Sequence, residues 1–278
     1  MTMPAELIGR YEIEDELAVG GMGLIYLARD PYIQRQVVVK VLMYSRTLEP
    51  VYREFFHREA EVIAALEHPN IVPVYDFGWH GQQPYIVMRY MSGGSLEDQL
   101  KKGDVKLSEA AHIFKRVASA LDAAHARNIV HRDIKPSNIL FDAAREAFLS
   151  DFGIAKSKPI ADEDGEWMVG TPAFMSPEQV TGAPVDGRAD VYALGVVLYR
   201  LLTGELPFAA DSTTALINAH VDRPIPDMRK IQQNIPAVWQ EVVGKAMAKD
   251  PNDRYPTAGD FARDVNEVVS GRWFLRKL

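Results

Sequence analysis

The sequence of 278 residues contains no cysteine. Disulfides, iron–sulfur clusters and thiolate zinc sites are therefore excluded, and the composition fits the reducing cytoplasm, where we expect the chain to act. The N-terminal stretch MTMPAELIGR lacks the apolar core of a secretory signal peptide. The longest apolar run, near Tyr192 to Tyr199, is far too short to cross a bilayer, so we expect no membrane span in this chain.

Basic residues are in the minority. The chain has 31 Lys and Arg against 38 Asp and Glu, a net charge of -7, and it has no long basic run. This balance argues against nucleic acid as the main partner. No internal repeat or low-complexity tract is present, and a hydrophobic share of 47% is that of a globular protein with a sizeable core.

The residues that carry chemistry are concentrated in the stretch His131 to Leu140, HRDIKPSNIL. Pro136 prevents a regular helix through its middle, so we expect a loop with fixed backbone angles. The carboxylate of Asp133 can accept a hydroxyl proton, and the ammonium of Lys135 can neutralise phosphate charge. The amide oxygen of Asn138 suits a hard cation such as Mg²⁺.

A second acidic motif follows this loop. Asp151 opens a DFG triplet after the run AFLS, which predicts a short strand. A single polar loop is more often structural, with Asp133 capping a turn and Asn138 tolerating a tight bend. The ordered pair of motifs, HRDxKxxN and then DFG, instead matches the signature of phosphoryl transfer.

With these motifs the chain resembles the eukaryotic-type protein kinase family, in particular the bacterial serine/threonine kinases, from Tyr11 to about Asp264. The resemblance implies an α+β bilobal fold with a small antiparallel β N-lobe, one regulatory helix and a larger, mainly helical C-lobe. It implies transfer of the γ-phosphoryl group of ATP, with Mg²⁺ or Mn²⁺, to serine or threonine of protein substrates in signal transduction, the chain itself included. The expected parts of this single domain, 1–278, are an N-lobe at about 1–89, a hinge at about 89–94 and a C-lobe at about 95–278.

The resemblance assigns catalytic roles to five residues. Asp133 would orient the acceptor hydroxyl, and Lys135 would steady the γ-phosphate. Lys40, in the strand VVVKVLM, would hold the α and β phosphates when paired with Glu59 of the helical stretch VYREFFHREAEVIAAL. Thr171 would bond Asp133 and Lys135 and help to admit serine or threonine. Without the resemblance, Lys40 is best explained as a snorkelling edge lysine and Glu59 as a solvated glutamate.

A glycine-rich hairpin also resembles the family. The stretch YEIEDELAVGGMGLIYLA predicts two strands around a turn, and glycines there let backbone N–H groups approach phosphates. A plain hairpin turn is the alternative, since Ala18 replaces the first glycine of the family motif. The residues that the resemblance assigns to ATP binding are Leu17, Ala18, Val19, Gly20, Gly21, Met22, Gly23, Leu24, Ile25, Val38, Lys40, Met88, Arg89, Met91 and Leu140. The implied metal ligands are Asn138 and Asp151.

For adenine, the resemblance makes Met88 the gatekeeper and the backbone of Arg89 and Met91 the hydrogen-bonding edge. Arg89 stands where the family usually has glutamate, a change that backbone recognition should tolerate. Val38 stands where the family usually has alanine, and this added bulk can cost about 1–3 kcal/mol. The expected adenine sandwich consists of Ile25, Val38 and Leu140.

The histidines are interpreted as structural, because none has the spacing of a metal ligand. His125 lies on the apolar side of a predicted helix, SEAAHIFKRVASALDAAHARN, which we expect to begin with a cap at Ser108. The resemblance places His131 in an internal hydrophobic column with Ile63, Val74 and Phe152.

Three further residues are expected to support the site without taking part in chemistry. Asp190, at the start of the apolar helix DVYALGVVLYRLL, would brace the backbone of the catalytic loop. Glu178 of GTPAFMSPEQ would form a buried, bidentate pair with Arg254 of DPNDRYPTA.

The segment after DFG is the most individual part of the sequence. Family members often carry threonines here whose phosphates pair with the arginine before the catalytic aspartate, which is Arg132 in this chain. An acidic run, ADEDGE, takes their place, and the only hydroxyl between DFG and Val169 is that of Ser157. We hypothesise that a carboxylate replaces the phosphate, the alternative being a disordered acidic loop. The candidate acids are Glu163, Asp164 and Glu166.

Two other functions stay open from the sequence. A pseudokinase, a nucleotide-binding scaffold without turnover, is suggested by Ala18, Val38 and the missing threonines. A small-molecule kinase of similar fold is disfavoured, because such enzymes lack the segment GTPAFMSPEQ and its arginine partner. The resemblance also implies a homodimer through the N-lobe and a longer native protein that continues into a linker and a membrane helix.

Overall fold

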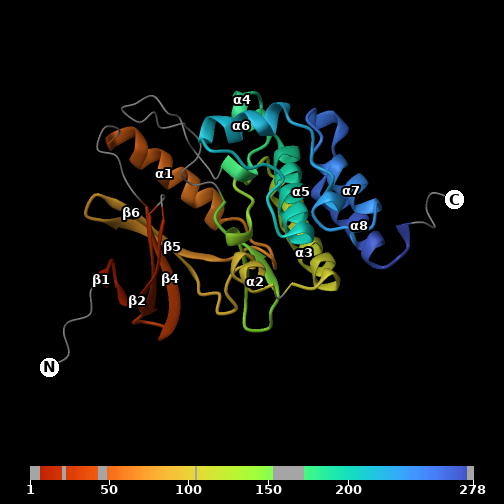
Figure 1. The fold of residues 1–278 in the computed structure, drawn as a ribbon. Helices are drawn as coiled ribbons and strands as arrows, with labels where there is room; N and C mark the ends of the chain where they lie inside the picture. Colours follow the sequence, from red (N-terminus) through yellow and green to blue (C-terminus); the bar gives the residue numbers. More distant parts are fainter. Residues whose placement is uncertain (1–6, 21–22, 43–48, 104, 153–171, 274–278) are drawn as a thin grey trace. The chain divides into compact units, whose positions relative to one another are not determined.

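The computed structural model describes residues 7–20, 23–42, 49–103, 105–152 and 172–273. The chain divides into two compact units, which we describe separately. Unit 1 comprises Met1–Glu67 and Ile71–Ser92, and unit 2 comprises His68–Asn70 and Gly93–Leu278. Unit 1 is mainly strands and unit 2 is mainly helices, as the predicted α+β fold requires (Figure 1). Within the described ranges, no helix has the length and apolar character needed to cross a membrane.

Unit 1 is an antiparallel sheet with one helix. Its strands lie in the order β1-β2-β3-β4-β6-β5. The predicted glycine-rich hairpin is confirmed, because Gly20 and Gly23 form the last pair between β2 and β3, and the turn residues 21–22 lie outside the described ranges. The elements are β1 (Leu7–Ile8), β2 (Tyr11–Gly20), β3 (Gly23–Asp30), β4 (Arg35–Leu42), α1 (Glu49–Ala64), β5 (Val74–His80) and β6 (Gln83–Arg89).

Strand β4 shows how the two faces of this sheet differ. Val37, Val39 and Val41 are at most 5% exposed and lie in the core of one face. Val38 and Lys40 alternate with them and are half-buried on the other face, as the period of two in a strand requires. The core cluster also contains Ile8, Tyr11, Ala28, Tyr85 and Val87.

Unit 2 is built around helix α5, most of whose side chains are buried. Helices α3, α7 and α8 pack against α5, and β7 and β8 form a two-stranded sheet (Figure 1). The helices are α2 (Leu96–Lys102), α3 (Leu107–His125), α4 (Pro177–Thr181), α5 (Gly187–Thr203), α6 (Thr213–Asp222), α7 (Val238–Ala246) and α8 (Ala258–Val269). The strands are β7 (Ile139–Phe141) and β8 (Ala147–Leu149), and the 3₁₀ turns are η2 (Pro136–Asn138), η3 (Pro172–Phe174), η4 (Met228–Lys230) and η5 (Pro251–Asp253).

Two predicted helix starts are wrong. Helix α3 begins at Leu107, one residue before the predicted start, so Ser108 is not its cap. The carboxylate of Glu109 accepts the N–H of Lys106 at 3.5 Å and supports this earlier start. Helix α5 begins at Gly187 and not at Asp190, because the carboxylate of Asp186 caps it by accepting the N–H of Arg188 at 2.9 Å.

His220 of α6 is a fully buried imidazole in unit 2. Its Nδ1 lies 2.9 Å from the hydroxyl of Tyr192, and its ring meets that of Phe208 edge-on at 5.0 Å. Burial, and secondarily the nearby charge of Lys249, lowers the pKa of His220 to about 4. The backbone of Ala173 has a smaller, opposite effect on this pKa.

This burial makes stability depend on pH. Because the unfolded chain binds a proton near pH 6.5 and the folded imidazole only near pH 4, stability is lost as the pH falls between these values. The full loss is about 3 kcal/mol. We expect His220→Gln to flatten this dependence in urea unfolding, while His80→Gln, at an exposed position, leaves it unchanged. If the free energy of unfolding changed equally with pH in the wild type and both variants, the pH dependence would not come from His220.

Candidate active site

One face of the unit 1 sheet gathers predicted ATP-binding residues. Directly opposite residues of an antiparallel pair point to the same face. The register gives one row of Ala18, Ile25, Lys40 and Ile86. It gives a second row of Leu27, Val38 and Met88. The five predicted residues in these rows therefore share one face.

Other residues of the predicted set lie elsewhere on the hairpin. Leu24 alternates with Ile25 along β3 and pairs with Val19, so these two lie on the opposite face. Val19 is 65% exposed, and Leu17 lies at an irregularity of β2 with 43% exposure. The register does not bring these three residues to the face that carries Lys40.

Helix α1 packs on the face that carries Lys40. The ring of Phe56 contacts that of Phe77 at 6.3 Å, and Phe77 pairs with Ile86, the cross-strand partner of Lys40. Glu59 is half-buried and lies one turn after Phe56, on the side of α1 that also buries Ala60 and Ile63. Glu59 therefore stands on the sheet side of the helix, and its pairing with Lys40 stays a prediction.

Gly23 has a structural reason to be glycine. Its φ is +140°, and a β-carbon there would come within 1.8 Å of the carbonyl oxygen of Val41. The close approach of β3 to β4 therefore requires glycine whether or not a phosphate binds. Gly21 and Met22 lie outside the described residues, so phosphate binding by this turn stays a prediction.

The segment predicted to read adenine has one backbone group already occupied. The N–H of Arg89 donates to the carbonyl of Pro73 at 3.0 Å. The backbone N–H of Arg89 is therefore already engaged within unit 1. Met91 is buried in unit 1, and Leu140 is half-buried in β7 of unit 2, where it pairs with Phe148.

The predicted catalytic loop brings three functional side chains together. The Nζ of Lys135 lies 3.0 Å from Oδ2 of Asp133, and the Nδ2 of Asn138 donates to the same oxygen at 3.1 Å. Nδ2 also donates to the carbonyl of Asp133 at 2.8 Å. Pro136 starts the turn η2 that places Asn138 here. Both bonds use the amide nitrogen, so Oδ1 of Asn138 faces away from Asp133 and is the atom that it could offer to a cation.

Strands β7 and β8 place Asn138 opposite the residue that precedes Asp151, the other predicted metal ligand. Ile139 pairs with Leu149, so Asn138 lies opposite Ser150. The N–H and the Oγ–H of Ser150 both donate to the carbonyl of Asn138, at 2.9 and 3.1 Å. Asp151 follows directly, with a left-handed φ of 62°. Ser150 was not predicted, since a serine after a short strand carries no distinctive pattern.

Asp190 holds the backbone of the catalytic loop, as predicted. Its carboxylate is 1% exposed and accepts the N–H of His131 at 2.9 Å and that of Arg132 at 2.8 Å. The Nε2 of His125 lies 2.7 Å from the same carboxylate. The structural interpretation of His125 is therefore confirmed, with the addition that its partner is the residue that supports the loop.

His131 is packed and hydrogen-bonded within unit 2. Its ring lies 4.6 Å from that of Phe152, and its Nε2 lies 2.8 Å from the carbonyl of Ser150, so it links the two predicted motifs. Its contact with Phe152 is confirmed. The rest of the predicted column, Ile63 and Val74, belongs to unit 1 and stays a prediction.

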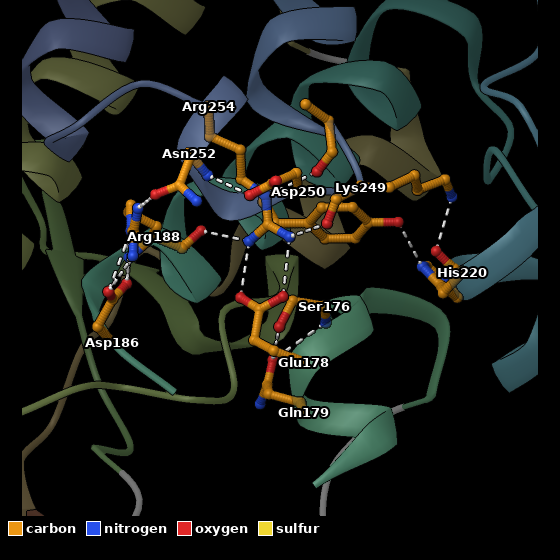
Figure 2. A network of polar contacts seen from close by, with 12 residues as sticks. Ser176, Glu178, Gln179, Asp186, Arg188, His220, Lys249, Asp250, Asn252 and Arg254 are labelled. Carbon is orange, nitrogen blue, oxygen red and sulfur yellow. Dashed lines mark hydrogen bonds and ion pairs between the residues drawn. The ribbon is translucent and has the colours of Figure 1, made fainter. Parts of the chain in front are cut away.

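The predicted pair of Glu178 and Arg254 is confirmed, and it is bidentate. The two guanidinium nitrogens of Arg254 lie 2.7 and 2.8 Å from the two carboxylate oxygens, and both side chains are buried (Figure 2). Next to it, the Nε2 of Gln179 donates to the carbonyl of Arg132 at 2.9 Å. Gln179 was missed because a helical glutamine is usually solvated.

The residues present fit a divalent cation of the magnesium type. The described residues hold no group of three or more His, Asp or Glu side chains that could bind a metal. Mg²⁺ does not need one, because it keeps several waters and binds through one or two carboxylates together with substrate phosphates. One amide oxygen from Asn138 and one carboxylate from Asp151 match that donor set. Thr171, Ser157 and the acids at 163, 164 and 166 lie outside the described residues.

The support of Asp190 can be tested at Gly187. A β-carbon there would lie 2.5 Å from Nδ1 of His125, so Gly187→Ala must displace the imidazole from Asp190. We expect a loss of about 1–3 kcal/mol of stability and faster amide exchange at His131 and Arg132. The matched control is Gly244→Ala in α7, where a β-carbon has nothing within 4 Å. This change should be neutral or stabilising, and the same loss in both variants would refute the contact.

The model of the protein kinase domain family matches residues 11–274. The chain is 42% identical over 282 aligned residues to the serine/threonine-protein kinase PknB of Mycobacterium leprae, covering 98% of this chain and 45% of that protein. It is 40% identical to PknH of Mycobacterium bovis, covering 95% and 45%. The crystal structure of the Mycobacterium tuberculosis PknI kinase domain matches with a TM-score of 0.76 and 29% identity over 96% of this chain and 99% of that one. The chain spans about half the length of these curated relatives. By its motifs, its fold and these matches, the chain belongs to the protein kinase domain family.

Proposed function

We propose that the chain is a serine/threonine protein kinase that transfers the γ-phosphoryl group of Mg-ATP to serine or threonine hydroxyls of proteins. One observation carries this proposal: Asp133, Lys135 and Asn138 form one bonded cluster beside the strand end that bears Asp151. Protein kinases as a family use ATP and a divalent metal, and PknB and PknH are serine/threonine kinases by name.

Within unit 2, the side chains have separable tasks. Asp133 would accept a hydrogen bond from the substrate hydroxyl and take up its proton. Lys135, 3.0 Å away, would balance the charge of Asp133 and of the transferred phosphoryl group. Asn138 and Asp151 would hold Mg²⁺, or Mn²⁺ in its place. The bound ion supplies charge neutralisation to the phosphates.

Within unit 1, one sheet face would receive the nucleotide. Lys40 would bind the α and β phosphates, with Glu59 fixing its ammonium. Ile25 and Val38 would pack on adenine next to Met88, with the carbonyl of Arg89 as acceptor. The position of these residues on one face supports this assignment. On that face, the bulk of the Val38 side chain would reduce the space for adenine.

The protein substrate class follows from two features. Lys135 and Thr171 are the residue types that serine/threonine kinases carry at these motif positions. Tyrosine kinases replace that lysine and usually carry proline in place of the threonine. The segment that follows Thr171 is fixed by the pair of Glu178 and Arg254. Small-molecule kinases lack that segment, so we propose protein substrates. We place the activity in the cytoplasm, where ATP is available.

The test is an incubation of the purified chain with labelled ATP, magnesium and a generic basic protein, beside Asp133→Asn. We expect label in the wild type and a loss of at least about 10²-fold in the variant, because the general base is removed. Mass spectrometry should find phosphoserine or phosphothreonine only. ATP binding without label in the wild type would instead identify a pseudokinase.

The same assay tests the acidic segment. The side chain of Arg132 is exposed, and no ion pair is formed by it among the described residues, which supports a role for an acid at 163, 164 or 166 as its counter-ion. We expect the triple alanine variant to have lower turnover. Unchanged turnover would remove the hypothesis.

We also propose a homodimer through unit 1, by likeness to the family. Two large apolar side chains at the turn between β3 and β4 support it, Tyr32 at 79% and Ile33 at 55% exposure. Sedimentation should show a dimer that Ile33→Glu dissociates. A wild type that stays monomeric at high concentration would exclude it.

A further inference from the structure

Arg132, the residue before the proposed general base Asp133, has a left-handed backbone with a φ of 63°. A non-glycine residue keeps this conformation only where its surroundings hold it in place. The peptide group before Arg132 is held by Asp190, which accepts the Arg132 N–H at 2.8 Å. The peptide group after it joins Arg132 to Asp133, so its position sets the direction in which the side chain of Asp133 leaves the backbone.

This second peptide group is hydrogen-bonded at both of its polar atoms. Its N–H, that of Asp133, donates to Nδ1 of His131 at 3.2 Å. Its carbonyl oxygen, that of Arg132, accepts a hydrogen bond from Nε2 of Gln179 at 2.9 Å. The bond to His131 lies within the catalytic loop and moves with it, whereas Gln179 is 47 residues away in the sequence. Gln179 therefore holds this peptide group from outside the loop.

The amide of Gln179 is oriented by Ser176, the residue before the first turn of α4. Its Oε1 accepts the N–H and the hydroxyl of Ser176, both at 3.1 Å (Figure 2). Because two donors engage the oxygen, the Nε2 end of the amide points the other way, towards the carbonyl of Arg132. Ser176 is fully buried, so the group that orients the amide is itself fixed.

Helix α4 has a fixed place in unit 2. Glu178, the residue before Gln179, forms the buried bidentate pair with Arg254. The guanidinium of Arg254 also donates to three backbone carbonyls, at 2.7, 3.0 and 3.1 Å. Gln179 thus connects a firmly held part of unit 2 to the peptide group beside Asp133.

We propose that Gln179 is a positioning residue for phosphoryl transfer: its amide ties α4 to the carbonyl of Arg132 and so fixes the peptide group from which Asp133 reaches the acceptor hydroxyl. This inference rests on the proposed function, because that function makes Asp133 the general base. Gln179 itself takes no part in the chemistry. Because it fixes the geometry of a reacting group and contacts no substrate, its contribution falls on kcat.

Gln179→Glu tests this bond with the smallest change of shape. Glutamate serves at this position of a helix cap as well as glutamine, so it still accepts both groups of Ser176. It has no N–H, however, and places an oxygen against the carbonyl of Arg132. We expect kcat to fall about tenfold, the effect of one lost hydrogen bond. The KM for ATP and for a peptide substrate should stay within about twofold of the wild type.

Gln240→Glu is the matched control. Gln240 is the half-buried third residue of α7, as Gln179 is of α4. Its Oε1 accepts the N–H of Met228 at 3.0 Å, and its Nε2 donates to the carbonyl of Pro226 at 3.4 Å. The same exchange therefore removes a donor to a carbonyl outside the catalytic loop and should leave kcat unchanged. An unchanged kcat in Gln179→Glu, or an equal fall in both variants, would overturn the proposal.

Gln179→Met separates the lost hydrogen bond from the added charge. Methionine has a similar length but no donor and no charge, so we expect the same fall in kcat as in Gln179→Glu. Full activity in Gln179→Met would assign the effect to the new carboxylate and would also overturn the proposal.

Hydrogen exchange keeps the proposal testable if the wild type transfers no phosphate. The amide of Asp133 belongs to the peptide group that Gln179 holds, so it should exchange faster in Gln179→Glu than in the wild type or in Gln240→Glu. Equal exchange at Asp133 in the three proteins would refute the role of Gln179. Missing activity with this difference intact would refute only the kinase assignment.

Discussion

The buried carboxylate of Asp190 is the interaction on which the catalytic loop depends. Arg132 has a left-handed φ of 63°, a conformation that costs a non-glycine residue about 1–3 kcal/mol. Asp190 accepts the N–H groups of Arg132 and His131, and hydrogen bonds to a charged acceptor contribute about 1.5–3 kcal/mol each. The free energy of two such hydrogen bonds exceeds the cost of the strained backbone at Arg132, so the loop holds this shape without a ligand. His125 keeps the carboxylate of Asp190 in place.

In unit 1 the constraint is strand register. A shift of one residue between β3 and β4 would turn the side chain of Lys40 into the valine core. Val39 would then take the place of Lys40 on the opposite face. The burial of Val37, Val39 and Val41 makes that shift unfavourable. The hydrophobic core of one face thereby fixes which side chains stand on the other.

Much of this could be predicted from the sequence, because motifs and alternation are local. The hairpin, the strand with Lys40, the loop of Asp133 and the pair of Glu178 and Arg254 were all correctly predicted. The helix starts at Leu107 and Gly187 were not, because several residues near each start can cap a helix and the pattern does not say which of them does so. Ser150 and Gln179 were missed for a different reason, since the residues they contact are not their neighbours in the sequence.

The second strained residue, Asp151, lies next to an equally firm anchor. Strand β8 is fixed by the bond from the Leu149 N–H to the Asn70 carbonyl, and Ser150 binds the Asn138 carbonyl twice. Both left-handed residues of the site, Arg132 and Asp151, are thus adjacent to backbone that buried polar groups hold. Phosphoryl transfer depends mostly on positioning and charge, so functional groups that are in place before ligands bind lower the barrier without a reorganisation cost at the moment of reaction. The free energy of these bonds therefore stabilises the geometry of the site, which is why the supporting residues matter to the proposed chemistry as much as the side chains that would carry it out.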